Sequence, residues 1–237
     1  MPLMRLDKLI GDCGLASRKE IKQMIKQGRV TVDGVSANAP ETKIDPAVSV
    51  VAIDGAPVAY SKYHYYMMYK PDGVLSATDD GKQKTVLDLV TPEMRKMGLF
   101  PVGRLDKDTT GLLLLTDDGE FAHKVISPKS EIVKVYHACT EMPVNEADVK
   151  AFAAGIILAD GTKCLPAELV ILDDGSCLVK VMEGKYHQVK RMLASRGKPV
   201  TALHRASIGG LTLDKCLKPG DFRPLDENEL CRVMMGK

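Results

Sequence analysis

Hydrophobic residues recur at helical spacing twice near the start of the chain. Residues 6–13 repeat apolar positions at i, i+3, i+4 and i+7, the pattern of one buried helix face, and Gly14 ends the segment. Ser17 and Glu20 then form the pair of a capping box, which predicts a second helix ending at Gly28. We expect this helix to direct three apolar side chains inward: Ile21, Met24 and Ile25.

After these helices the pattern changes to alternation. RVTVDG, residues 29–34, predicts a strand that turns at Asp33–Gly34. SVVAIDGAPVAYSKYH, residues 49–64, completes this first module and leads out of it. We place the boundary near residue 60, where turn residues give way to the apolar run YYMMY. The predicted domains are therefore residues 1–60 and 61–237.

The second domain alternates short apolar strands with helical stretches. Helices are expected near residues 119–126, 145–154 and 186–196. The expected strands are Tyr65–Tyr69, Leu112–Thr116, Val133–Ala138, Glu168–Leu172 and Cys177–Val181. This pattern predicts a mixed α+β domain, with a sheet too discontinuous for a doubly wound fold. The nucleotide-binding patterns GxGxxG and GxxxxGK[ST] do not occur in the sequence.

Composition narrows the class of protein. The 237 residues are 45% hydrophobic and 27% charged, which predicts a substantial core and a soluble chain. No apolar run approaches the roughly 20 residues of a membrane span, and MPLMRLDKLI is too charged for a signal peptide. The six cysteines form no CxxC pair. We therefore expect reduced thiols in a cytoplasmic protein, with no zinc site.

Positive charge is concentrated at the start of the chain. Residues 1–30 carry seven Lys and Arg against three acids, a net charge of +4, whereas the remainder carries −2. Several of the basic residues fall on the outer face of the second predicted helix. Such a face is either a solvated surface or a phosphate-binding surface. The basic residues that we consider for RNA binding here are Arg5, Arg18, Lys19, Lys22, Lys26 and Arg29.

The segment GRLDKDTTGLLLLTDDGE, residues 103–120, has two interpretations. Its residues 106–110 match the DxDxT pattern of magnesium-dependent phosphohydrolases of the haloacid-dehalogenase type, with Asp117–Asp118 as possible metal ligands. That chemistry requires apolar residues before the nucleophile. Here the apolar run follows Asp106, which disfavours this interpretation without removing it.

The same segment resembles the catalytic motif of pseudouridine synthases at essentially every fixed position. The resemblance implies that Asp106 is the nucleophile that detaches uracil from its ribose, so that the base can be rejoined through C5. It also implies a mixed, mostly antiparallel sheet flanked by helices. Because the isomerisation consumes nothing and moves no hydride, we expect neither a cofactor nor a metal.

A carboxylate buried beneath an extruded base needs a nearby cation to stay ionised. EGKYHQVKRMLASRG, residues 183–197, resembles the family segment that supplies this cation, which would be Lys190. Two further family elements are Tyr136, in EIVKVYHACT, and the K-P pair at Lys70–Pro71. Tyr136 would pack on the uracil and assist loss of the C5 proton, or would be an ordinary core tyrosine. Lys70–Pro71 would shape the floor of the site or form a structural turn.

The first module resembles, over nearly all its length, the S-four-type RNA-binding module. This resemblance implies that its second helix lies against structured RNA. Extruding a uridine costs a few kcal/mol, which phosphate contacts can offset. Further candidate RNA contacts in the second domain are Arg104, His187, Gln188, Arg191 and Arg205.

Two stretches suggest which branch of the family the chain resembles. YHQVKRM and LHRASIGGLTLDKCLKPGDFRPLDENEL resemble the branch that acts on small-subunit ribosomal RNA. The large-subunit branch is the alternative within the class. The alternative from another functional class is a catalytically inactive ribosome-assembly factor, but such a protein would lack Asp106 or Lys190. We expect a monomer that acts on ribosomal RNA, either naked or within an assembling subunit.

Overall fold

The computed structural model describes residues 3–58 and 60–235. The chain divides into two compact units, Met1–His64 with Val90–Leu99, and Tyr65–Leu89 with Phe100–Lys237. The segment 90–99 thus groups with the first unit, although it falls within the second predicted domain. In the described part of the chain, the helices are all too short or too polar to cross a membrane.

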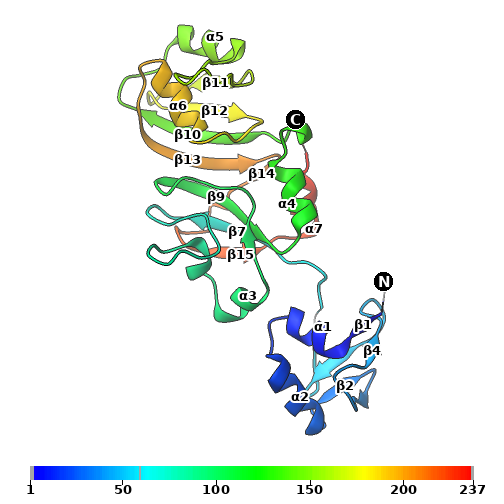
Figure 1. The fold of residues 1–237 in the computed structure, drawn as a ribbon. Helices are drawn as coiled ribbons and strands as arrows, with labels where there is room; N and C mark the ends of the chain where they lie inside the picture. Colours follow the sequence, from blue (N-terminus) through cyan, green and yellow to red (C-terminus); the bar gives the residue numbers. More distant parts are fainter. Residues whose placement is uncertain (1–2, 59, 236–237) are drawn as a thin grey trace. The chain divides into compact units, whose positions relative to one another are not determined.

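The first unit combines short helices with small sheets (Figure 1). Its helices are α1 (Leu6–Asp12), α2 (Arg18–Lys26) and α3 (Pro92–Lys96). Its strands are β1 (Met4–Arg5), β2 (Val30–Val32), β3 (Val35–Ser36), β4 (Lys43–Ile44), β5 (Val51–Ile53) and β6 (Ala56–Pro57). The strands pair as a two-stranded sheet β1-β4 and a four-stranded sheet β3-β2-β5-β6.

Local sequence explains where these elements begin and end. The predicted capping box is present at α2, where the Ser17 backbone N–H donates to Glu20 at 2.7 Å. Gly28 adopts φ +71° directly after α2, and the turn between β2 and β3 places both Asp33 and Gly34 at positive φ. Ile21 and Ile25 are buried, together with the apolar face of α1. The helix pair and its core therefore follow from the spacing of apolar residues.

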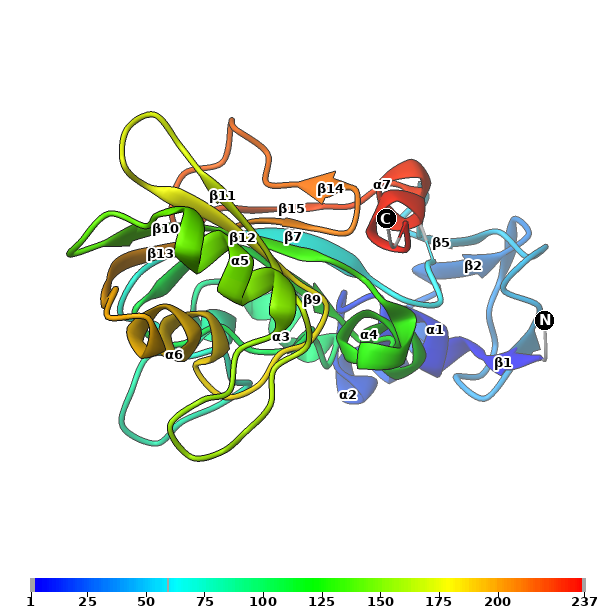
Figure 2. The ribbon, with the colours of Figure 1, turned by 90° about the horizontal axis from the view of Figure 1, so that it is seen from above.

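The second unit is built on one nine-stranded sheet (Figures 1 and 2). Its strands are β7 (Tyr65–Lys70), β8 (Phe100–Pro101), β9 (Thr109–Thr116), β10 (Lys134–Thr140), β11 (Glu168–Ile171), β12 (Cys177–Val181), β13 (Val200–Ile208), β14 (Leu211–Thr212) and β15 (Phe222–Pro224). The order is β11-β12-β10-β13-β9-β7-β15, with β14 on β13 and β8 on β9. The pair β9–β13 is parallel and the other pairs are antiparallel, so the expected mixed, mostly antiparallel sheet is confirmed.

Helices cover this sheet and contribute to its cores. They are α4 (Gly119–Ile126), α5 (Glu146–Ala154), α6 (Gln188–Ser195) and α7 (Glu227–Val233), with 3-10 turns at Val86–Asp88 and Pro128–Ser130. Residues from α5 and α6 form one core with β10, β11 and β12, and α6 lies along β13 in both views (Figures 1 and 2). Residues from α4 and α7 form another core with β7 and β9.

Candidate active site

Asp106 lies in the short loop that precedes β9, and this loop is held from both sides. On one side, the hydroxyl of Ser76 donates to the Leu105 carbonyl at 2.9 Å and accepts from the Leu105 N–H at 3.1 Å. On the other side, the fully buried Lys70 donates to the carbonyls of Lys107 and Thr109 at 3.0 and 2.8 Å. The backbone around Asp106 is thus fixed before any substrate binds.

Lys70 is the last residue of β7, which places its ammonium beside the carbonyls of Lys107 and Thr109. Burial lowers the pKa of its ammonium to about 8, because an apolar surrounding disfavours charge. A third bond, to the carbonyl of Pro71 at 3.0 Å, closes the cage of acceptors around Nζ. Lys70–Pro71 therefore ties β7 to the loop that carries Asp106.

Lys190, on the first turn of α6, joins the two aspartates of the loop. Its Nζ lies 3.2 Å from Asp106 Oδ2 and 2.5 Å from Asp108 Oδ1. Burial opposes the charge of Lys190, but the bonds to Asp108 and Asp106 outweigh it and raise the pKa of the ammonium. The same hydrogen bond lowers the pKa of Asp108. The pairing that the sequence predicts is present, and Asp108 extends it to a triad of charges.

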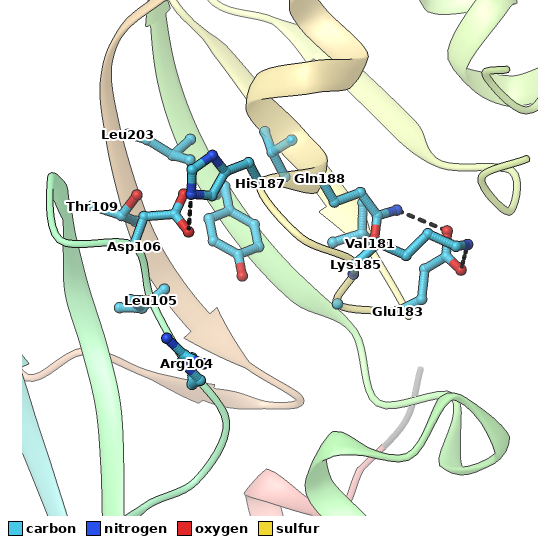
Figure 3. Close-up of a pocket in the computed structure, with 13 residues that line it drawn as sticks. Arg104, Leu105, Asp106, Thr109, Val181, Glu183, Lys185, His187, Gln188 and Leu203 are labelled. Atoms are coloured by element: carbon cyan, nitrogen blue, oxygen red, sulfur yellow. Dashed lines mark hydrogen bonds and ion pairs between the residues drawn. The ribbon is translucent and has the colours of Figure 1, made fainter. Parts of the chain in front are cut away.

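His187 completes the surroundings of Asp106 (Figure 3). Its Nε2 lies 3.4 Å from Asp106 Oδ1, and its ring stacks on the exposed ring of Tyr186 with centroids 3.9 Å apart. His187 has φ +47°, a left-handed conformation that is rare and strained for a residue other than glycine. This backbone conformation directly precedes α6 and aims the imidazole at the carboxylate.

The carboxylate faces an open hollow in the second unit. Arg104, Tyr136 and Leu203 contribute to its walls, and Glu183 lies on its far side from Asp106 (Figure 3). Tyr136 stands on β10 directly opposite Arg205 of β13. An anionic group, an aromatic ring and aliphatic walls together can hold a planar base beside a nucleophile.

Several predicted RNA contacts are exposed and available. Arg104 is exposed at the rim and makes no ion pair or hydrogen bond with another described residue. The same holds for four exposed basic residues of α2: Arg18, Lys19, Lys22 and Lys26. Arg5 and Arg29 are also exposed, but they pair with Asp7 at 2.8 Å and Asp54 at 2.5 Å. Four exposed basic side chains without an ion partner among the described residues therefore lie on α2.

Two of the predicted RNA contacts, Gln188 and Arg205, are buried. Gln188 is buried, and its amide donates to Glu183 at 2.8 Å and accepts from the Lys185 N–H at 2.9 Å. Arg205 is 4% exposed and donates through Nε to the Leu112 carbonyl at 2.8 Å. Both side chains therefore lie inside the second unit rather than at its surface, and their assignment as RNA contacts stays a prediction. Arg191 is half-buried and pairs with Asp160 at 2.5 Å.

Sequence reasoning missed the acids that organise the basic helix. Glu183 is buried and accepts bonds from Gln188, Lys185 and the Leu165 N–H. The sequence does indicate this role, because Glu183 stands directly before the turn at Gly184. An acid between a strand and a basic helix has basic and amide side chains close to it. Asp108 was visible in the motif, but its bond to Lys190 depends on tertiary packing.

The arrangement of acids does not support phosphohydrolase chemistry. Asp106 precedes β9 and Asp117–Asp118 follow it, so an eight-residue strand of about 26 Å separates them. Asp118 is also the N-cap of α4, accepting from the N–H groups of Glu120 and Phe121. Within the described residues, no group of three or more His, Cys, Asp and Glu could hold a metal ion.

Comparison with known proteins agrees with this fold. The family model "RNA pseudouridylate synthase" matches residues 64–195, and the model "S4 domain" matches residues 4–49. The chain therefore belongs to the RNA pseudouridylate synthase family, with an S4 domain before the catalytic part. A solved structure described as a pseudouridylate synthase is 35% identical, with a TM-score of 0.69, over 97% of this chain and 99% of that chain.

Curated relatives match along nearly the whole chain. It is 42% identical to the ribosomal small subunit pseudouridine synthase A of Escherichia coli (strain K12), over 98% of this chain and 100% of that protein. The protein of the same name from Vibrio cholerae is 42% identical, over 97% and 99% of the two chains. An uncharacterised RNA pseudouridine synthase of Bacillus subtilis is 44% identical, over 96% and 97%.

Proposed function

We propose that this protein isomerises a uridine of small-subunit ribosomal RNA to pseudouridine. The observation that carries the proposal is the Asp106 carboxylate, paired with Lys190 at 3.2 Å and facing a hollow lined by Tyr136. The choice of the small subunit is supported by relatives of that name, which match this chain over nearly its entire length. The large-subunit alternative has no feature of the described structure in its favour.

Asp106 is the proposed nucleophile. The Lys190 ammonium lies 3.2 Å from the Asp106 carboxylate and offsets the negative charge there, while Asp108 holds the ammonium in place from the other side. The backbone bonds from Lys70 and Ser76 fix the loop, so the carboxylate does not need to reorganise when the sugar arrives. An ionised, positioned carboxylate can bond to the electron-poor sugar carbon or take a proton from the sugar.

Tyr136 and Arg104 have proposed roles on either side of the base. Tyr136 packs on the extruded uracil, and its hydroxyl assists loss of the C5 proton. Arg104 lies exposed at the rim with no partner among the described residues, so it is available to occupy the space that the uridine leaves in the RNA. His187 orients the carboxylate from the third side.

The S4 domain is proposed to hold the RNA. Exposed basic residues on α2 give a phosphate-binding surface, which supplies affinity and position without reading sequence. We further expect the protein to act in the cytoplasm as a monomer, with ribosomal RNA or an assembling small subunit as its partner. The domain limits at residues 60 and 61 stay a prediction.

The proposal is tested by release of tritium from small-subunit RNA labelled at uracil C5. Wild type is expected to release tritium without added metal. Asp106→Asn keeps the shape of the side chain but removes its charge, and this variant is expected to release none. The matched control is Asp173→Asn, which makes the same change at an exposed position in a turn between β11 and β12. Release by Asp106→Asn at the wild-type rate would remove the nucleophile assignment.

A further inference from the structure

Besides Lys70, whose ammonium is held by three backbone carbonyls, two further cations lie inside the second unit without a carboxylate partner among the described residues. Lys134 is 7% exposed and makes no side-chain hydrogen bond or ion pair with another described residue. Arg205 is 4% exposed, and its Nη2 has no hydrogen-bond partner in the described part of the chain. Burying a charge is expensive unless an opposite charge compensates it. Both side chains therefore point to a negative partner that comes from outside the chain.

Both cations line a second hollow, which we call the cationic hollow. It shares Arg104, Tyr136, Glu183 and Gly184 with the hollow at Asp106, so the two hollows adjoin at these residues. Among the residues that line it, the acid is Glu183, which already accepts bonds from Gln188 and Lys185. The charge available in the cationic hollow is thus positive.

The register of the sheet aligns the cations with the tyrosine. Lys134 and Tyr136 are two residues apart on β10, so their side chains lie on the same face. Arg205 pairs with Tyr136 across β10 and β13, and its Nη1 donates to the tyrosine hydroxyl at 3.5 Å. Both cations therefore lie beside Tyr136, the residue proposed to pack on the uracil.

The isomerisation itself produces an anion at this place. When the bond between N1 and C1′ breaks, both electrons stay on N1, and the base becomes a monoanion whose charge is shared by O2 and O4. C5 then bonds to C1′, C5 loses its proton, and N1 gains one, so the product is an isomer of the substrate. The base is negative between these steps whether Asp106 bonds to the sugar carbon or removes a sugar proton.

We propose that Lys134 and Arg205 bind the outer edge of the extruded uracil and stabilise the negative charge that it carries between cleavage and rejoining. This inference rests on the proposed function. Positive groups fixed in advance where charge develops are a large source of rate enhancement. Lys190 cannot supply this charge to the base, because it is held between Asp106 and Asp108.

The ionisation of Lys134 agrees with this role. Burial and the nearby Arg205 lower the pKa of its ammonium to about 8, which leaves it mostly charged at neutral pH. Removing the charge should therefore slow the chemical step and leave RNA binding intact. The α2 surface that holds RNA belongs to the other unit of the chain.

The test is the single-turnover rate of tritium release by the full chain at saturating enzyme, measured together with RNA affinity. We expect Lys134→Met to lower the rate about 10²-fold, the effect of losing one preorganised donor, with an unchanged Kd. Lys134→Arg, which keeps the charge, should recover part of the rate. The matched control is Lys180→Met on β12, on the opposite face of the sheet and paired with Glu168, which should retain the wild-type rate.

A second substrate separates charge stabilisation from a packing role. RNA with 5-fluorouridine carries a base that leaves as a more stable anion, so the deficit of Lys134→Met should shrink on it, measured as loss of intact 5-fluorouridine. Three results would each overturn the inference. The first is a wild-type rate in Lys134→Met, and the second is an equal loss of rate on both substrates. The third is a defect confined to Kd, as expected for a phosphate contact. An inactive wild type would instead overturn the proposed function.

Discussion

Lys134 links the stability of the protein to pH. Its pKa in the folded state is about 8, lowered by burial and Arg205, against 10.5 for the free side chain. Between these values the unfolded chain binds more protons than the folded one, so this residue makes stability rise with pH. Below pH 8 the full burial penalty is present, and it disappears as the pH approaches 10.5.

We therefore predict that Lys134→Met is most stabilising, relative to wild type, at or below pH 7. The difference between variant and wild type should shrink steadily as the pH rises from 8 to 10.5, because only above pH 10.5 is the wild-type lysine mostly neutral in both states. Urea unfolding at several pH values measures the difference directly. Lys70 has a similar pKa and is present in both proteins, so its contribution cancels. A pH-independent difference would contradict the prediction.

Gly111 illustrates a residue fixed by close approach of two strands. It has φ +108°, and a Cβ at this position would lie 2.3 Å from the carbonyl oxygen of Arg205 on the parallel neighbour β13. A side chain there would push β9 and β13 apart next to the Asp106 loop. The glycine of the catalytic motif is therefore a packing requirement as well as a backbone one.

Gly111→Ala is expected to destabilise the second unit by more than about 2 kcal/mol, since positive φ and backbone overlap add. Gly175→Ala is the matched control. Gly175 also has positive φ, +82°, but no atom lies within 4 Å of the place that an alanine methyl group would take, so only about 1 kcal/mol is expected. Equal losses in thermal or urea unfolding would show that the approach of β13 is not limiting.

At the scale of elements, α2 depends on its capping box. The Ser17 hydroxyl accepts from the Glu20 N–H at 3.4 Å, and the Glu20 carboxylate accepts from the Ser17 N–H at 2.7 Å. Ser17→Ala leaves one of these helix-end donors without its partner. We expect a loss of about 1 kcal/mol in local stability. Faster amide hydrogen exchange in α2, with unchanged exchange in α6, is the expected result; Gln23→Ala in the same helix should change little.

The elements that follow from local pattern could be predicted, and those that depend on pairing could not. The five predicted strands and three predicted helices of the second domain correspond to β7, β9, β10, β11, β12, α4, α5 and α6. The long strand β13 was missed because HRAS interrupts its apolar pattern with polar side chains. Its parallel pairing with β9 buries Arg205, and no local signal indicates that.

The site divides in the same way. Asp106, Lys190 and Tyr136 could be named from their motifs; the structure places Asp106 and Tyr136 in the lining of one hollow and pairs Lys190 with Asp106. The unpaired burial of Lys134 and Arg205 could not be predicted, because a basic residue on a strand is usually solvated. Only the register between β10 and β13 places these two cations beside Tyr136.

At the scale of the whole molecule, the two units divide binding from chemistry. The hollow at Asp106 is formed entirely by residues of the second unit, and the uncompensated basic face of α2 belongs to the first. If α2 contacts phosphates, removing its charges should weaken RNA binding, because fewer counterions are then released when the RNA binds. The reaction rate of the bound complex should stay unchanged. Binding and rate can therefore be perturbed separately in one chain.

We predict that Lys19→Ala with Lys22→Ala lowers RNA affinity and flattens its salt dependence. Each lost phosphate contact should reduce the slope of log affinity against log salt by about 0.7, so two contacts reduce it by about 1.4. The control is Lys150→Ala with Lys215→Ala, which removes the same charge from exposed positions of the second unit. The net charge is the same in both double variants. An equal change of the salt slope in both would therefore mean that overall charge, and not contacts at α2, determines the salt dependence. A change confined to the α2 variant, with the single-turnover rate of tritium release preserved at saturation, would place the phosphate contacts on α2.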